Sequence, residues 1–65
     1  MAALAQPVLI PVGVFKTFGE TGPMYEVLGS APRGPKGEMI HIRVFFTGEE
    51  LDYPLADMLS DPVKP

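Results

Sequence analysis

Residues 38–59, which read EMIHIRVFFTGEELDYPLADML, decide the fold of this chain. From Met39 onward apolar side chains alternate with mixed ones, and the first set consists of Ile40, Ile42, Val44 and Phe46. Successive side chains of a strand point to opposite faces, so this period of two predicts a strand whose core face carries those four residues. β-branched and aromatic residues favour the same assignment. The opposite face, with His41, Arg43 and Phe45, is mixed, which indicates partial cover by another element or by a partner.

A turn and a further strand follow. The segment Thr47-Gly48-Glu49 interrupts the apolar run, and Gly48 can adopt a positive φ at little steric cost, so a tight hairpin turn is predicted. Alternation then resumes and predicts a strand with one buried and one acidic face; its apolar positions are Leu51, Tyr53 and Leu55, and the others are Glu50, Asp52 and Pro54. Because Pro54 cannot donate a ladder hydrogen bond, this strand must end there or lie at an edge of the sheet.

The chain is expected to finish with a short helix over residues 54–60. Apolar side chains recur there at i, i+3 and i+4, forming one stripe of Leu55, Met58 and Leu59. Proline is favoured in the first turn of a helix, and Asp52 is a candidate capping residue. The helix should end at Asp61, because a residue that precedes proline resists the α region.

The N-terminal half predicts two more strands. Residues 12–18 form the first, and a turn rich in glycine and proline separates it from residues 24–29, in which Tyr25 and Val27 share a face. Residues 30–37 contain two prolines and two glycines, so we expect a loop without regular structure.

The predicted fold is therefore mainly β: an antiparallel meander of about four short strands that curls into an SH3-like partial barrel, with a short C-terminal helix. Residues 12–61 form this single small domain. Residues 1–11 are interpreted as a flexible or partner-docking arm, and residues 62–65 as a C-terminal tail that is expected to fray.

Size and charge limit the function classes. In a chain of 65 residues, ordering costs of about 1.5 kcal/mol per residue nearly cancel the contribution of so small a core. Two stabilising routes are open, a compact β core or association with a second copy or a larger protein. Eight acidic residues oppose five basic ones, giving a net charge of −3. This charge disfavours nucleic acid as a partner and favours a protein with a basic surface.

Other features argue against cofactors and membranes. The chain has no cysteine and one histidine, so no metal site and no cofactor are predicted. No apolar run approaches the roughly 20 residues that a membrane span needs. The N-terminal residues lack the basic start of a signal peptide, and we expect a cytoplasmic protein.

The candidate binding site is an acidic group of Glu49, Glu50 and Asp52, with Phe45 and Arg43 beside it. Glu50 and Asp52 share a strand face, which either discourages pairing between sheets or recognises a basic partner. An exposed aromatic ring such as Phe45 would contribute binding energy. We therefore expect a non-enzymatic protein-binding module, with a regulatory or inhibitory role like that of an antitoxin or a phage-type inhibitor.

Two alternatives belong to other classes. A small nucleic-acid-binding barrel would use Arg33, Lys36 and Arg43 together with the aromatic residues. An enzyme would use His41 as a general base, assisted by Glu26 across the sheet. No serine or cysteine nucleophile stands at an evident spacing, so no catalytic residue is predicted.

Three patterns carry a resemblance: G-V-F-x-x-F-G at residues 13–19, G-P-x-Y-E-V at residues 22–27, and T-G-E-E-x-x-Y-P-L at residues 47–55. With them the chain resembles a bacterial family of small domains of unknown function over residues 11–62, with residues 30–37 outside the resemblance. The resemblance implies a compact folded unit of bacterial or phage origin. It implies no activity and no catalytic residue.

Overall fold

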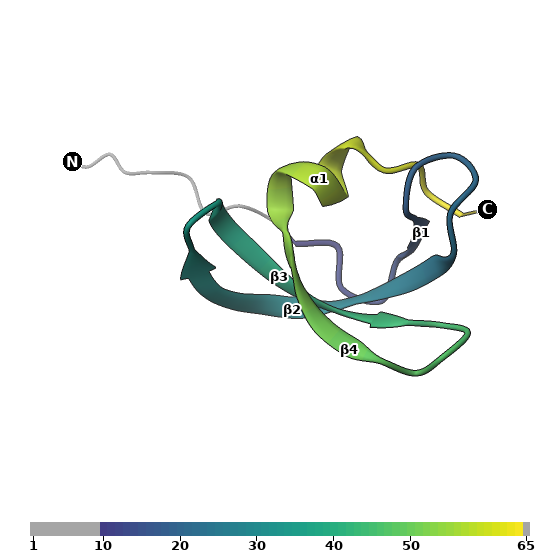
Figure 1. Cartoon of the computed structure of the whole chain (residues 1–65), viewed down its shortest axis with the longest axis horizontal. Coiled ribbons are helices and arrows are strands. Elements are labelled where there is room, and N and C mark those ends of the chain that lie inside the picture. Colours follow the sequence, from purple (N-terminus) through teal and green to yellow (C-terminus); the bar gives the residue numbers. More distant parts are fainter. Residues whose placement is uncertain (1–9, 65) are drawn as a thin grey trace.

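The computed structural model describes residues 10–64, and most of the arm predicted over residues 1–11 lies outside this range. Four strands form one antiparallel sheet in the order β1-β2-β3-β4, and a single short helix follows. The elements are β1 Phe15–Thr17, β2 Met24–Gly34, β3 Gly37–Val44, β4 Glu50–Pro54 and α1 Leu55–Ser60. The sheet curls into a half-barrel with α1 on its concave side (Figure 1). The predicted meander with a short C-terminal helix is confirmed.

The core follows from alternation along the two central strands. β2 and β3 are antiparallel neighbours, with Val27 opposite Ile42 and Ser30 opposite Ile40. The inward side chains of both strands meet the apolar side of α1, and together they form a core of Tyr25, Val27, Ile40, Ile42, Leu55 and Met58. The inward facing predicted for Ile40 and Ile42 is confirmed, because both are fully buried.

The prediction of a loop over residues 30–37 is wrong. β2 continues to Gly34 and β3 starts at Gly37, so only a two-residue turn separates them. The register shifts around Pro32, and a proline is tolerated at such an irregularity because the ladder needs no N–H there. Pro35 suits the second position of a tight turn, and Gly37 adopts φ 96°. Proline and glycine thus shape a hairpin here without excluding strands.

Two strand boundaries also differ from prediction. β1 covers only Phe15–Thr17, although Val14 still accepts a hydrogen bond from the Val27 N–H (3.0 Å). β3 ends at Val44, because the following residues already form the turn. The prediction that Phe46 lies on the core face is wrong, because the residue is 91% exposed.

The helix begins at Leu55, after Pro54, and ends at Ser60. No side chain caps its N-terminus, so the predicted cap by Asp52 is wrong; that carboxylate contacts His41 instead. The predicted apolar stripe is narrower than expected, because Leu59 is 60% exposed. A helix of six residues presents only one narrow face to the half-barrel.

The described residues after α1 lie along β1. Val63 forms an isolated antiparallel bridge with Lys16. The Lys64 N–H donates to the Phe15 carbonyl (2.8 Å), and the Thr17 N–H donates to the Pro62 carbonyl (3.2 Å). This segment therefore covers the outer edge of β1, at the side of the sheet opposite β4.

A carboxylate connects the two ends of the half-barrel. Asp61 Oδ2 accepts hydrogen bonds from the hydroxyls of Tyr25 (2.7 Å) and Tyr53 (2.9 Å), and Oδ1 accepts one from the Gly19 N–H (3.0 Å). The Phe18 ring packs on both tyrosines, with centroids 4.5 and 5.2 Å away. Asp61 thereby joins β2, β4 and the β1–β2 turn directly after α1.

Burial and hydrogen bonding shift the pKa values of these groups. Burial alone would raise the pKa of Asp61, but the hydrogen bonds from Tyr25, the Gly19 N–H and Tyr53 hold it below its ordinary value. Burial, followed by the hydrogen bond to Asp61, raises the pKa of Tyr53 to about 12. Both effects keep the tyrosines protonated as donors and the carboxylate ionised as acceptor.

Lys16 is buried beside this group. Its side chain is on β1 and only 7% of the residue is exposed. The Nζ atom donates to the carbonyl of Met58 (2.6 Å), in the last turn of α1. A cation is favourable near the C-terminal end of a helix, so Lys16 ties α1 to β1.

We expect Asp61→Asn to lower the free energy of unfolding by about 1–3 kcal/mol at pH 7, because an ionised acceptor of three hydrogen bonds is lost. The pKa of Asp61 is lowered in the fold, so its stabilisation is present above the unfolded value of about 4 and is lost as the pH falls through the folded value. Urea unfolding at pH 7 and at successively lower pH values would measure both effects.

The matched control is Asp57→Asn, which removes an exposed carboxylate from the preceding helix α1 and should change the stability by less than about 0.5 kcal/mol. Equal losses for the two variants, or a difference that does not shrink on acidification below pH 4, would contradict the role given to Asp61.

Candidate functional site

The outer face of the sheet, opposite the core, carries a group of charged side chains. The strand register places Glu26 of β2 opposite Arg43 of β3, and Arg43 opposite Glu50 of β4. One step along, His41 of β3 lies opposite Asp52 of β4. Opposed residues on neighbouring strands share a face. These five residues, Glu26, His41, Arg43, Glu50 and Asp52, form the outer-face cluster.

Arg43 is held between acidic residues on both sides. Its Nη2 atom lies 2.9 Å from Glu26 Oε1, and its Nη1 atom lies 4.0 Å from Glu50 Oε2. The guanidinium therefore links β2, β3 and β4 across the outer face. The pairs are solvent-exposed, so each contributes roughly 0–1 kcal/mol to stability.

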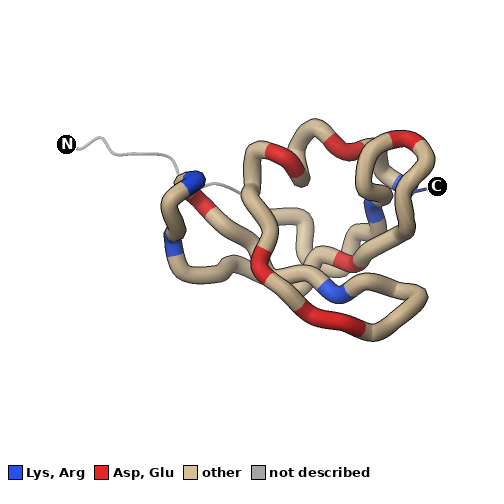
Figure 2. The backbone as a smooth tube through the Cα atoms, in the orientation of Figure 1, with Lys and Arg blue, Asp and Glu red and all other residues tan. Residues whose placement is uncertain are grey.

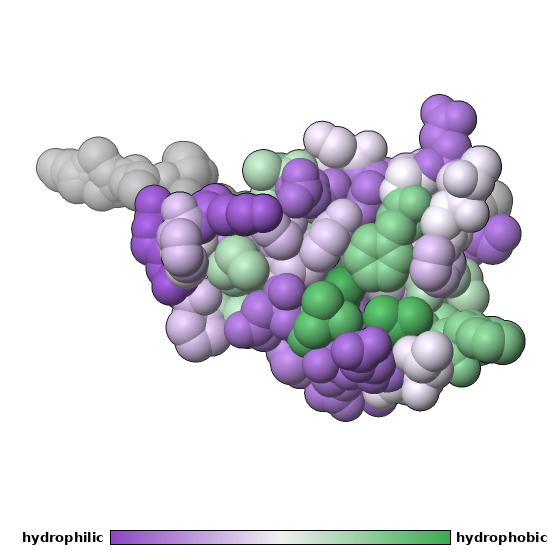
Figure 3. Space-filling model, viewed as in Figure 1, coloured by the Kyte–Doolittle hydropathy of each residue, from purple (hydrophilic) through white to green (hydrophobic). Residues whose placement is uncertain are grey.

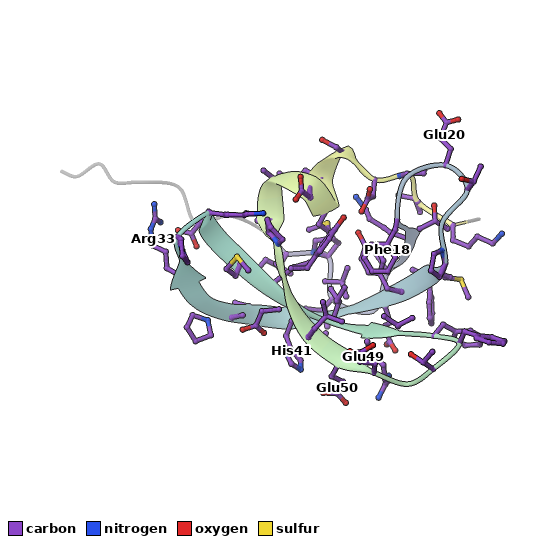
Figure 4. All side chains as sticks on the ribbon, in the orientation of Figure 1. Phe18, Glu20, Arg33, His41, Glu49 and Glu50 are labelled. Carbon is purple, nitrogen blue, oxygen red and sulfur yellow. The ribbon has the colours of Figure 1, made fainter. Side chains whose placement is uncertain are left out.

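His41 is held by two carboxylates at once. Its Nδ1 atom lies 2.9 Å from Asp52 Oδ1, and its Nε2 atom lies 2.9 Å from Glu50 Oε1. An imidazole can donate from both nitrogens only when it is protonated. Hydrogen bonding to Asp52, and then to Glu50, accordingly raises the pKa of His41. Figure 4 shows His41, Glu49 and Glu50 in the lower part of the view, around β4.

The structure divides the predicted binding residues into two adjoining groups. Arg43, Glu50 and Asp52 belong to the outer-face cluster, whereas Glu49 and Phe45 lie in the turn between β3 and β4. Phe45 is 63% exposed, and its ring meets Phe15 edge-on with centroids 6.1 Å apart. In Figure 2 the two consecutive acidic residues, Glu49 and Glu50, mark the end of this turn.

Sequence reasoning missed His41 and Glu26 as members of the cluster. The available signal was alternation, because His41 is two residues from Arg43 on one strand and so shares its face. The pairing of His41 with Glu26, on which the enzyme alternative depended, is wrong. Glu26 instead accepts a hydrogen bond from Arg43, and the strand register places His41 opposite Gly29 of β2.

The basic residues of the nucleic-acid alternative do not gather on one surface. Arg33 lies near the β2–β3 turn, where Nη1 pairs with Glu38 Oε2 (2.6 Å). Arg43 lies in the middle of the sheet and is engaged by Glu26. Figure 2 shows two basic positions at the β2–β3 end, and a further basic position apart from them among acidic ones.

The outer-face cluster is a solvated surface with excess negative charge. Counted together with Glu49, it has four carboxylates and one guanidinium, a formal charge of −3 while His41 is neutral. Over residues 10–64 no cavity is found, and no group of three or more histidine and carboxylate side chains has the geometry of a metal site. The carboxylates that contact His41 lie at its two different nitrogens and do not converge on one point.

These features define the class of protein: a small β half-barrel closed by one helix, with a charged outer face. The sequence model of a family described as a family of unknown function (DUF5397) matches residues 2–64, and the chain belongs to this family. No curated protein matches the sequence. The expected resemblance to a family of small domains of unknown function is confirmed, and the match also includes residues 30–37. In the described part of the chain, no helix is both long enough and apolar enough to cross a membrane.

We expect the imidazole of His41, the single histidine of the chain, to titrate with a midpoint above 6.5, its ordinary value. Its contribution to stability should therefore be complete below that value and be lost as the pH rises through the folded value. The NMR shift of its ring protons against pH measures the midpoint directly.

Asp52→Asn should lower this midpoint more than Glu50→Gln, because the hydrogen bond to Asp52 has the larger effect on the pKa. Glu20→Gln, in the distant β1–β2 turn, is the control and should leave the midpoint unchanged. A midpoint at or below 6.5 in the unmodified protein would refute the two-carboxylate arrangement.

Proposed function

We propose that this protein is a non-enzymatic binding module that recognises another protein through the outer-face cluster and the adjoining β3–β4 turn. The observation that carries the proposal is the juxtaposition of exposed aromatic rings with excess carboxylates. Phe45 is 63% exposed, in the same turn that carries Glu49 and leads into Glu50 of the cluster. Aromatic side chains with a charged rim are typical of protein interfaces.

The charge of this surface favours a partner with a basic patch. Arg43 and His41 do not balance the carboxylates around them, so the face stays negative. Complementary charge raises the association rate and selects among partners more than it raises affinity. The ion pairs also hold Glu50 and Asp52 in place, which reduces the side-chain entropy lost on binding.

The free edge of β4 is poorly suited to adding a strand from a partner. The Val44 N–H donates to the Glu49 carbonyl (2.7 Å), so by the antiparallel alternation Leu51 and Tyr53 bond toward β3. The outward backbone groups then belong to Glu50, Asp52 and Pro54, and the last has no N–H. A short, acidic, proline-ended edge discourages strand addition, which favours docking on the face.

The role we propose is regulatory or inhibitory, comparable in size and charge to an antitoxin or a phage-type inhibitor. Bacterial origin, suggested by the sequence motifs, and a cytoplasmic location are part of the same proposal. Association with a second copy is compatible with it, through surfaces other than the outer face.

We expect Glu49→Lys to abolish recovery of the partner when the tagged protein is used to isolate it from the native host at physiological salt. The Glu49 carboxylate makes no hydrogen bond within residues 10–64, so this charge reversal removes recognition without breaking an internal pair. Mass spectrometry identifies the recovered protein, and binding of the purified pair then quantifies the loss.

The control is Glu20→Lys, which makes the same change of charge at an exposed position in the β1–β2 turn, away from Glu49 and Glu50 (Figure 4). Partner binding that survives Glu49→Lys, or that is lost equally with Glu20→Lys, would count against the proposed surface.

A further inference from the structure

The β3–β4 turn exposes a second aromatic ring that the sequence pattern assigns to the core. Phe46 is 91% exposed, more than any other large apolar residue in the described chain. Figure 3 shows apolar surface at the lower right of the molecule, where Figure 1 places this turn. A large apolar side chain held in water is unfavourable for an isolated protein, and clustered exposed rings mark interaction sites.

The turn that carries Phe46 is closed by several hydrogen bonds. The Val44 N–H donates to the Glu49 carbonyl, and the Gly48 N–H donates to the Val44 carbonyl, each at 2.7 Å. Gly48 adopts φ 76°, which favours glycine, and Thr47 Oγ1 accepts from the Glu49 N–H (3.2 Å). Phe46 is therefore presented by a defined backbone, and less conformational entropy is lost when it binds.

The neighbouring ring supports the turn from the sheet. The Phe45 N–H donates to the Met24 carbonyl (2.9 Å), which fastens the turn to the start of β2. The Phe45 ring packs edge-on against Phe15 of β1. Phe45 is thus partly engaged within the protein, whereas Phe46 projects beyond it.

From this geometry we infer that Phe46 is the principal anchor of the interface and inserts into an apolar pocket with a basic rim on a protein partner. The inference rests on the proposed function and deepens it. Glu49 and Glu50 flank the turn, so basic side chains around the pocket would complement them.

Charge also favours a basic-rimmed protein over two other candidate partners for the exposed turn, a second copy of the chain and a lipid surface. A second copy docked turn to turn, with the two-fold axis at this turn, would bring Glu49 and Glu50 near the same residues of its neighbour, and like charges repel. An anionic lipid surface would be repelled by the same carboxylates. A pocket with a basic rim on a different protein would bury the Phe46 ring and place positive charge near the carboxylates of Glu49 and Glu50.

The test begins with p-benzoylphenylalanine in place of Phe46, in the full chain, irradiated in native host cells. The same photoreactive residue in place of Leu59, an exposed apolar position on α1, is the control. We expect position 46, and not position 59, to cross-link to one protein, at a peptide with apolar residues next to lysine or arginine. Cross-links to a second copy of the chain or to phospholipid would overturn the inference.

The test is completed by purifying the partner that the cross-link identifies and measuring its affinity for variants of this protein. Phe46→Ala should weaken binding at least about 30-fold, as expected for an aromatic residue at the centre of an interface, and Leu59→Ala less than about twofold. Because the Phe46 ring is almost fully exposed, Phe46→Ala should leave the urea midpoint unchanged, so the loss is not one of folding.

Failure of this inference is distinguishable from failure of the proposed function. If Glu49→Lys abolishes binding and Phe46→Ala does not, the acidic surface stands and the anchor is refuted. If Phe46→Ala abolishes binding and Glu49→Lys does not, the basic rim is refuted. If neither variant affects binding, both proposals fail.

Discussion

The half-barrel depends on the hydrogen bonds that Asp61 accepts. Its carboxylate joins Tyr25 of β2, Tyr53 of β4 and the backbone of Gly19 in the β1–β2 turn. Because Asp61 directly follows α1, these bonds fix where the helix ends and direct the next residues along the edge of β1. A chain this short has a small core, and a partly buried ionised acceptor with three donors holds it in a single closed arrangement. The Lys16 bond to the last turn of α1 supports the same closure from the other side.

The arrangement of side chains on the outer face is determined by which residues the core buries. β3 contributes Ile40 and Ile42 to the interior, and the residues between and after them, His41 and Arg43, must then point outward. Any slip of one residue in the register would exchange these two sets, so burial of the isoleucines also fixes the charged residues opposite β4. The recognition surface that we propose is therefore as well defined as the core beneath it, although its own ion pairs are exposed and weak.

The β3–β4 turn leaves two apolar rings outside the core, where they can serve binding but not folding. Strand alternation would continue through Phe45 and Phe46, but the turn begins after Val44 and places both rings outside the core. The Phe45 ring packs against Phe15, whereas Phe46 has no aromatic neighbour within residues 10–64. Local disagreement between hydrophobic pattern and structure is expected at functional positions. Membership of a family of unknown function adds no activity to this picture, so the proposals rest on the surface itself.

The sequence by itself determined the fold class, the inward facing of Ile40 and Ile42, the Gly48 turn and the short helix, because each depends on local periodicity or on the backbone preference of one residue. It also placed Arg43, Glu50 and Asp52 together, since alternation assigns them to one face. Only the tertiary structure decided that residues 30–37 extend β2 and β3, that Phe46 is exposed, and that His41 lies between two carboxylates. It alone showed that Asp61 joins distant elements. Strand register, the onset of a turn and hydrogen bonds between residues far apart in the chain depend on how the whole sheet curls, which no local pattern encodes.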